Sequence, residues 1–396
     1  IGSEEVTNGN FSQEGSELIT NGDFDGNANG WNVGDWTYSN GKMVSNGAVN
    51  LLQSGRNFTV GKFYKITYTI QDYVSGGVVG LVGTSPYAET TERNENGVFT
   101  EIIECQASGS LFILQGRNNF IGSIDNVSVK EVGQDWTLGT GWSIGEDKAE
   151  RISTGSYTNV TQGGILTSGK SYKVTYTVNS GSIGGVRVQL GGTYTGDYNG
   201  VGTHTVYGVS GTTGFNNFNL VGEPTFNGSI TNISVKEVGQ NWNTLGGWSI
   251  GDNKAICDGT SIIYTNASIQ PSKDYKITYT VSDYVSGGVR PLINGAPNAE
   301  GIARTANGTY TEQLTSSSGA NGNFSFTAVG SFNGSVTNIS VLEITDDTNL
   351  PRINYSGFTY QDSLGSEEIV NGGFDSDTAW NKQTGWSIQN GYATQN

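Results

Sequence analysis

Apolar and polar side chains alternate in one segment that recurs three times along the chain. In residues 64–70 the large apolar side chains occupy even positions, whereas Lys and Thr occupy odd ones. The segments 172–178 and 275–281 keep the same alternation. A period of two predicts a half-buried antiparallel strand. No segment with a period of 3.6 residues is long enough to predict a substantial helix.

Longer similarities divide the chain into repeats. A Gly-Ser-(Ile/Val) motif followed by Asn-(Val/Ile)-Ser-Val begins at Gly122, Gly228 and Gly334, at intervals of 106 residues. Such a period is typical of one independent sandwich domain per repeat and is too long for solenoid units. The sequence therefore predicts an all-β chain of tandem antiparallel β-sandwich domains of jelly-roll type.

The repeats and their flanking segments set the expected domain limits. We expect a partial entry segment over 1–15, sandwich domains over 16–132, 133–238 and 239–344, a linker over 345–362, and the start of a truncated fourth repeat over 363–396. The entry motif is doubled, because Gly-Ser-Glu occurs at 2–4 and 15–17, each time followed by Asn-Gly-x-Phe. In the fourth repeat Trp380 and Trp386 match the tryptophan pairs of the earlier repeats. A quarter of a sandwich cannot bury its own face, so we expect the chain to be a window of a longer array.

Composition agrees with folded β domains. The chain has 60 Gly, 6 Pro and 14% charged residues, against about 25% charged in a typical domain. Aromatic residues make up 11% of the chain, which argues against disorder. Cys105 and Cys257 occupy non-equivalent positions in two repeats and predict no disulfide framework.

The acidic charge excludes several partners. A net charge of −16 argues against nucleic-acid binding and against attraction to anionic membranes. No apolar run approaches the 18 residues of a membrane span, so no membrane insertion is expected.

Catalytic chemistry is sparsely represented. His204 is the only histidine, and its Thr-His-Thr context is typical of a surface strand. The acids common to all three repeats are Glu131, Glu237 and Glu343, and nothing pairs with them consistently along the sequence. A glycosidase needs only two carboxylates, but its pair would have to be private to one repeat. We therefore expect a non-enzymatic protein.

Aromatic residues are the first binding candidates. Each repeat opens with two tryptophans, and the first of each pair is Trp31, Trp136 or Trp242. Exposed aromatic faces stack on sugar rings, whereas buried ones fill sandwich cores. Recurrence favours the core for the second tryptophan of each pair and leaves the first open.

A second set of candidates lies in a predicted loop. Asp72 and Tyr73 lie in Asp-Tyr-Val-Ser-Gly-Gly, which recurs with Asp283 and Tyr284, whereas the second repeat replaces it. Arg187 and Arg290 follow the Gly-Gly pairs at matching positions, where the first repeat has Val79. Loop aromatics and acids at one end of a sandwich could bind a glycan, and the arginines could bind hydroxyls or stiffen the hairpin.

The closing strand of the first repeat contains an acid at an apolar parity. Asp125 shares its parity with Val127 and Val129, so its carboxylate is expected to point inward. An inward carboxylate is costly unless it is paired or bound to a metal. The other repeats have Thr231 and Thr337 at this position.

Two resemblances extend this interpretation. Asn21-Gly22-Asp23-Phe24 and the closing 124–129 segment resemble the ends of carbohydrate-binding modules with a galactose-binding-like jelly roll. That resemblance implies a possible structural calcium held by Asp23 and Asp125 in the first repeat; the second and third repeats lack these residues. The repeats that end in Asp346-Asp347-Thr348-Asn349-Leu350-Pro351-Arg352-Ile353-Asn354-Tyr355 resemble repetitive virion proteins of tailed phages that infect marine bacteria.

Three functions remain open from the sequence. The first is a virion surface protein, such as a fibre, adhesin or capsid decoration, whose weak glycan-binding faces gain avidity from repetition. Its partners would be cell-surface or extracellular glycans, other virion proteins and, by analogy with fibres, further copies of the chain. The second is a secreted bacterial polysaccharide-binding array, and the third is a structural spacer without a ligand.

Overall fold

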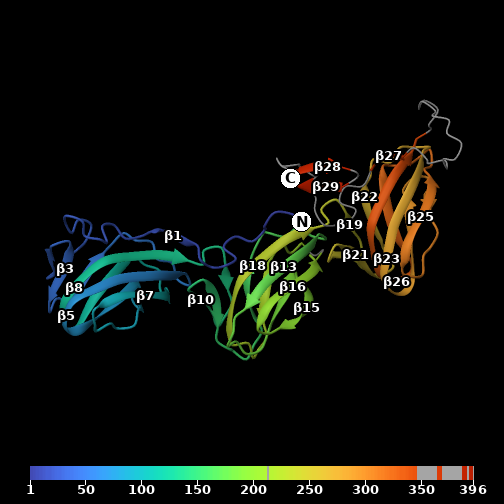
Figure 1. Cartoon of the computed structure of the whole chain (residues 1–396). Coiled ribbons are helices and arrows are strands. Elements are labelled where there is room, and N and C mark those ends of the chain that lie inside the picture. Colours follow the sequence, from blue (N-terminus) through green and yellow to red (C-terminus); the bar gives the residue numbers. More distant parts are fainter. Residues whose placement is uncertain (212–213, 346–363, 368–385, 390–391, 396) are drawn as a thin grey trace.

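The computed structural model describes residues 1–211, 214–345, 364–367, 386–389 and 392–395. All regular structure in these ranges is β-strand, paired antiparallel, which confirms the predicted all-β class. No described segment is a helix that could cross a membrane. Figure 1 shows three β bodies in sequence order. Most of the predicted linker and most of the predicted fourth repeat, including Trp380, lie outside the described residues.

Three buried apolar clusters form the three cores. We call the bodies around them the first, second and third domains and keep the sequence-based limits as proposed ones. The first domain has eight strands. They are β1 (Glu14–Glu17), β2 (Thr37–Ser39), β3 (Lys42–Asn46), β4 (Asn50–Gln53), β5 (Phe63–Gly83), β6 (Ala88–Glu89), β7 (Gly97–Glu104) and β8 (Leu111–Val132).

The third domain repeats this arrangement. Its strands are β19 (Asn243–Thr244), β20 (Trp248–Gly251), β21 (Lys254–Gly259), β22 (Ile262–Asn266), β23 (Asp274–Ile293), β24 (Ala299–Glu300), β25 (Gly308–Thr315) and β26 (Asn323–Ile344). In both domains two long neighbouring strands, β5 with β8 and β23 with β26, bend and contribute to both layers of the sandwich. The other described strands are β27 (Leu364–Glu367), β28 (Trp386–Gln389) and β29 (Tyr392–Gln395).

The second domain divides the same frame into two five-stranded sheets. One has the order β10-β11-β18-β13-β16 and the other β15-β14-β17-β12-β9. Their bounds are β9 (Thr137–Leu138), β10 (Trp142–Gly145), β11 (Lys148–Arg151), β12 (Thr158–Gln162), β13 (Ser171–Val178), β14 (Val186–Leu190), β15 (Thr193–Asn199), β16 (Gly202–Val209), β17 (Phe218–Gly222) and β18 (Gly228–Val238). The break between β13 and β14 falls where this repeat lacks the Asp-Tyr-Val-Ser motif.

The alternation in the recurrent strand is confirmed. Tyr64, Ile66, Tyr68 and Ile70 of β5 are almost fully buried, as the period of two requires. The segment predicted as a loop over 72–77 is instead a bulged bend inside β5, where the pairing with β8 shifts between Gln71 and Gly77. Gly76 has a φ of 75°, and a Cβ there would collide with the backbone of Phe120, so only glycine fits this bend.

The acids common to all repeats do have consistent partners. Glu131 lies 3.3 Å from Lys62, and the equivalent pairs are Glu237 with Lys170 at 3.6 Å and Glu343 with Lys273 at 3.4 Å. The sequence analysis missed these ion pairs because each lysine precedes its glutamate by more than 60 residues. The three glutamates are therefore part of the frame.

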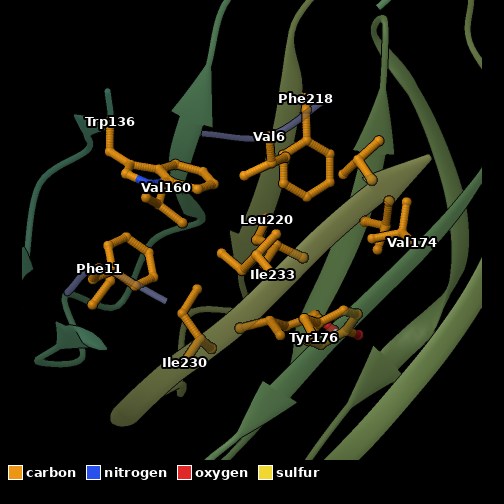
Figure 2. Close-up of a cluster of buried hydrophobic side chains, with 14 of the residues drawn as sticks. Val6, Phe11, Trp136, Val160, Val174, Tyr176, Phe218, Leu220, Ile230 and Ile233 are labelled. Atoms are coloured by element: carbon orange, nitrogen blue, oxygen red, sulfur yellow. The ribbon is translucent and has the colours of Figure 1, made fainter. Parts of the chain in front are cut away.

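The two copies of the entry motif lie on different domains. The second entry segment, residues 14–24, begins with β1 and pairs with β8 of the first domain. The first entry segment, residues 1–11, crosses to the second domain, where Glu4 pairs with Lys236 of β18. Figure 1 shows the N-terminus beside the second domain and the blue chain running from it toward the first. Val6 and Phe11 are buried in the core of the second domain, as Figure 2 shows.

Candidate functional site

The exposed side of one sheet in the second domain carries aromatic and polar side chains together. We call it the outer face and define it by Tyr157, Asn159, Arg187, Gln189, Tyr194, Tyr198 and Asn219. Strand alternation explains its composition: on β14, Val186, Val188 and Leu190 point into the core, which leaves Arg187 and Gln189 on the opposite side. Tyr194 on β15 pairs with Gln189 and so belongs to the same side.

Arg187 lies among three tyrosines on this face. Its guanidinium carbon is 5.0 Å from the ring centroid of Tyr194 and 5.8 Å from that of Tyr198. The ring of Tyr157 lies 6.0 Å from that of Tyr198 at an interplanar angle of 33°. Burial in this cluster raises the pKa of Tyr198, with Tyr157 and Tyr194 adding to the effect. Tyr157 and Tyr194 keep 61% and 47% of their surface exposed, so their rings remain available.

Amide side chains continue the outer face across the neighbouring strands. Asn159 donates from Nδ2 to Oδ1 of Asn219 at 3.0 Å, and Asn219 donates from Nδ2 to Oε1 of Gln189 at 2.8 Å. Gln189 in turn donates to the carbonyl of Gly192 at 3.1 Å. These bonds hold the amides in fixed orientations across three strands, which is the preorganisation that a binding surface needs.

The arrangement suits a sugar more than a reaction. Exposed tyrosine rings can pack against the apolar side of a pyranose, and the amides and the guanidinium can hydrogen-bond its hydroxyls. Within the described residues Arg187 makes no ion pair and no guanidinium hydrogen bond, and only its ring contacts are observed. A carboxylate or sulfate on a sugar could therefore take a bidentate position on it.

The same positions are occupied differently in the other two domains. In the third domain Arg290 forms an ion pair of 2.6 Å with Glu300. Glu300 takes the place of Tyr194, because it lies opposite Leu292 in the sheet as Tyr194 lies opposite Gln189 in the second domain. In the first domain Val79 replaces the arginine, and a separate buried apolar cluster covers the sheet with Leu81 and Ile113. Only the second domain combines an arginine with neighbouring exposed tyrosines on this side, among the residues that the structure describes.

The first tryptophan of each repeat is not an exposed platform. Trp31, Trp136 and Trp242 retain 8%, 6% and 2% of their surface, which contradicts the prediction of free aromatic faces. Trp31 donates from Nε1 to the carbonyl of Asn21 at 2.9 Å, and Trp136 to that of Asn8 at 3.0 Å. The rings of Trp31 and Trp136 are thus buried against the entry segments.

Asp72 and Tyr73 are engaged in the bend of β5. Asp72 accepts from Lys42 and, at 2.8 Å, from Ser123, and these two contacts lower the pKa of its carboxyl, with Lys42 as the larger cause. Tyr73 donates from its hydroxyl to the carbonyl of Gly76 at 3.0 Å. The carboxylate and the hydroxyl therefore stabilise the bulge, although Asp72 itself is exposed.

Asp283 and Tyr284 make the same contacts in the third domain. Asp283 accepts from Ser335 at 2.6 Å and from Lys254 at 2.9 Å, and Tyr284 donates to Gly287 at 3.0 Å. These contacts lower the pKa of Asp283, with Ser335 as the larger cause. The structure brings neither motif near Arg187, and as ligand contacts all four residues stay predictions.

Asp125 does not point inward, contrary to the parity argument. Asn126 has a φ of 51° and adds an extra residue to β8, because the four residues from Asp125 to Ser128 face only three, from Thr69 to Thr67. This bulge reverses the parity, so Asp125 is partly exposed and accepts from the backbone N–H of Asn126 at 2.7 Å.

Few calcium ligands lie around Asp23 and Asp125 in the first domain. Asp23 is exposed, and no group of three or more Asp, Glu, His or Cys side chains suited to a metal occurs in the described ranges. Two carboxylates fall short of the six to eight oxygens that calcium takes. Calcium stays an untested prediction, and nothing below depends on it.

Other candidates for chemistry have ordinary structural surroundings. His204 lies on β16, with its Nε2 2.7 Å from the carbonyl oxygen of Gly200 and its ring 5.5 Å from that of Tyr176. Cys105 and Cys257 are free and buried, as expected for residues outside a disulfide framework. A cleft of about 490 Å3 lies between the first and second domains, but the two tryptophans that line it, Trp136 and Trp142, are buried.

The sequence analysis identified Arg187 but missed the tyrosines around it. The signal was available in a comparison of the repeats, because Gly-Gly-Thr-Tyr-Thr-Gly-Asp-Tyr over 191–198 has no counterpart in the other two. Tyr157 carries no such signal, since its contact with Tyr198 arises only when β12 and β15 lie in one sheet.

Comparisons with known proteins add little to this site. No family model and no curated protein matches the chain. Among solved structures, the chain is similar to the N-terminal CBM22-1–CBM22-2 tandem domain of Xyn10C from Paenibacillus barcinonensis. The identity is 9%, the match covers 57% of this chain and 98% of that one, and the TM-score is 0.24. A similarity this low supports no inference about the outer face.

Proposed function

We propose that this chain is a non-catalytic extracellular surface protein that binds glycans through the outer face of its second domain. The observation that carries the proposal is the placement of Arg187 among Tyr157, Tyr194 and Tyr198 beside a fixed row of amides. The guanidinium favours a polysaccharide that carries carboxylate or sulfate groups over a neutral one. The first and third domains act as frame and spacer.

Affinity electrophoresis of the full chain through gels that contain single polysaccharides tests this proposal. We expect retardation by at least one acidic polysaccharide, and we expect Tyr194→Ala and Tyr157→Ala each to weaken binding about tenfold, because each ring loses its stacking surface. Tyr38→Ala is the matched control, since Tyr38 is also exposed but lies on β2 of the first domain. Equal retardation of all three variants would mean that binding lies outside the outer face, and no retardation across a broad panel would favour the structural spacer.

The sequence resemblance supports a place for the protein on a virion surface, as a fibre, adhesin or capsid decoration. A secreted bacterial polysaccharide-binding array is the alternative, and both use the same outer face. Mass spectrometry of particles banded in a density gradient separates the two. Peptides of this chain that co-band with capsid proteins support the virion, whereas peptides confined to soluble or cell-surface fractions support the secreted array.

A further inference from the structure

The first entry segment is held on the second domain by contacts that span its whole length. The backbone N–H groups of Gly2 and Glu5 donate to the carbonyls of Glu237 and Val235 at 2.8 and 2.9 Å. The Glu4 carboxylate accepts from the N–H of Val235, and Gly9 accepts from the N–H of Ile233 at 2.8 Å. The first entry segment thus lies as an added strand along residues 233–237 of β18, on the side where β11 pairs only with residues 228–230.

A glutamine on the opposite sheet recognises the middle of this segment. Gln162 accepts from the N–H of Thr7 at 3.2 Å and donates to the carbonyl of the same residue. At the far end Phe11 is 2% exposed and packs against Trp136 at 5.1 Å between ring centroids. A Cβ on Gly9 would collide with the carbonyl oxygen of Ile233, so the approach of the two strands requires glycine there.

The second entry segment makes the same contacts with the first domain. Gln53 binds the N–H and carbonyl of Thr20 as Gln162 binds those of Thr7. The Glu17 carboxylate accepts from Val129 at 2.8 Å, and Gly22 accepts from Val127 at 2.8 Å. Phe24 packs on Trp31 at 5.3 Å, as Phe11 does on Trp136. One sequence motif therefore fits one binding site on each of these domains. We call this site, formed by the last strand, the glutamine and the tryptophan of the domain, the seat.

A third copy of the motif takes the same register on the third domain. Leu364 pairs with Ile344 and Glu367 with Leu342 of β26, just as Glu14 pairs with Val132 and Glu17 with Lys130 of β8. The seats thus accept copies that arrive from different parts of the chain. The first entry segment reaches its seat from beyond the entire first domain, so its covalent connection does not determine which domain it fills.

We propose that the edge of β18, with Gln162 and Trp136, is a strand-acceptor site for the entry motif and that a second copy of this chain can supply the motif. The first entry segment is held only by non-covalent contacts, and the exposed residues Ser12 and Gln13 connect it to the second. Exchange of an identical element between copies needs no new interface, because every contact already exists within one chain. Chains would then be linked through their N-terminal segments.

A cleavable connection tests the acceptor site. The full chain receives a protease site between Ser12 and Gln13 and is cut after folding. We expect the cut segment to co-elute with the chain and a labelled synthetic peptide of residues 1–12 to replace it at equilibrium, so that the seat need not be emptied. A Phe11→Ala peptide should compete about 30-fold more weakly, because a buried aromatic anchor is lost. A Gly9→Ala peptide should not compete detectably.

A second measurement tests the partner. The cut chain is freed of its peptide by dilution and serves as the acceptor. The donor is an uncut chain carrying Gln162→Thr, which weakens the donor's own site for the entry motif. The mixture is examined by sedimentation velocity. A one-to-one complex supports exchange between copies, provided that Gly9→Ala in the donor removes it. Peptide exchange without any complex would limit the site to the chain's own segment and overturn the second-copy part. Failure of the labelled peptide to bind would overturn the acceptor site itself.

Discussion

The second and third domains share one frame and differ in what they place on it. Both bury the recurrent Tyr-x-(Ile/Val)-x-Tyr strand, and both have an arginine two residues after a Gly-Gly pair. In the third domain Glu300 neutralises Arg290, whereas in the second Tyr194 lies under Arg187, which forms no ion pair with any residue that the structure describes. One residue on a short neighbouring strand thus separates a structural ion pair from the proposed binding surface.

The cores differ at one matching position as well. Arg151 in the second domain corresponds to Cys257 in the third, because they pair with Gly228 and Gly334. Arg151 is 1% exposed and donates to the carbonyls of Ser156, Glu223 and Phe226 at 2.6 to 2.8 Å. Burial lowers the pKa of its guanidinium. The frame therefore tolerates very different residues at a position whose backbone pairing stays the same.

Loss of Arg151 should have the largest effect. Arg151→Ser places the residue of the first domain, Ser45, in the second and leaves several buried carbonyls without donors. We expect a loss of about 3 kcal/mol in the stability of the second domain. Hydrogen exchange of β11 and β18 measures it. Ser45→Ala is the matched control, expected to cost about 1 kcal/mol because its hydroxyl donates to the carbonyl of Phe120 and accepts from the N–H of Ala48. Equal losses of stability in the two variants would mean that Arg151 contributes no more than a serine hydroxyl does.

Exchange of the residue beside the arginine should convert one surface into the other. Tyr194→Glu pairs Arg187 with a carboxylate, as in the third domain, and should lower affinity for an acidic polysaccharide at least tenfold, about 1.4 kcal/mol. Tyr194→Phe is the control that keeps the ring and should bind nearly as well as the original chain. Glu300→Tyr frees Arg290 and should add weak binding to the third domain. Unchanged calorimetric titrations for Tyr194→Glu would contradict the role of Arg187.

Lowering the pH should destabilise the third domain slightly more than the second. The lowered pKa of Asp283 means that its contacts with Ser335 and Lys254 stabilise the third domain above the unfolded value of about 3.9 and are lost as pH falls through the folded value. The second domain has Ser180 instead of this aspartate. Hydrogen exchange between about pH 5 and pH 2.5 should therefore show the bulge of β23 opening before the β13–β14 connection. Asp283→Asn should remove the difference.

Much of the frame was predictable because its signals are local. A period of two places Tyr64, Ile66 and Tyr68 inside, and its recurrence identifies the same strand in each of the three domains. The parity argument failed at Asp125 because the left-handed conformation of Asn126 inserts one residue, and no composition rule predicts where a strand gains one. Asn126, Asn232 and Asn338 all adopt it, so the bulge belongs to the frame.

The candidate site was only partly predictable because it depends on contacts between strands. Arg187 was identified by its position after the Gly-Gly pair, but its suitability for binding depends on Tyr194 and Tyr198 on the next strand. The tryptophans recur in every repeat, which favours the core for the second of each pair but leaves the first open between a platform and a core. Trp31 and Trp136 are buried where the entry segments dock, and that docking joins residues such as Asn8 and Trp136 across 128 positions.

The path of the first entry segment also sets an order of events on a translating ribosome. The second entry segment can dock once β8 has been made, about 100 residues later, whereas the first must wait for β18, more than 200 residues after its own synthesis. At about 5–20 residues per second, the first entry segment waits roughly 10–45 s between its own synthesis and that of β18. During that interval the nascent chain displays an unpaired strand with two apolar anchors, and neighbouring chains on one messenger would display the same strand beside it.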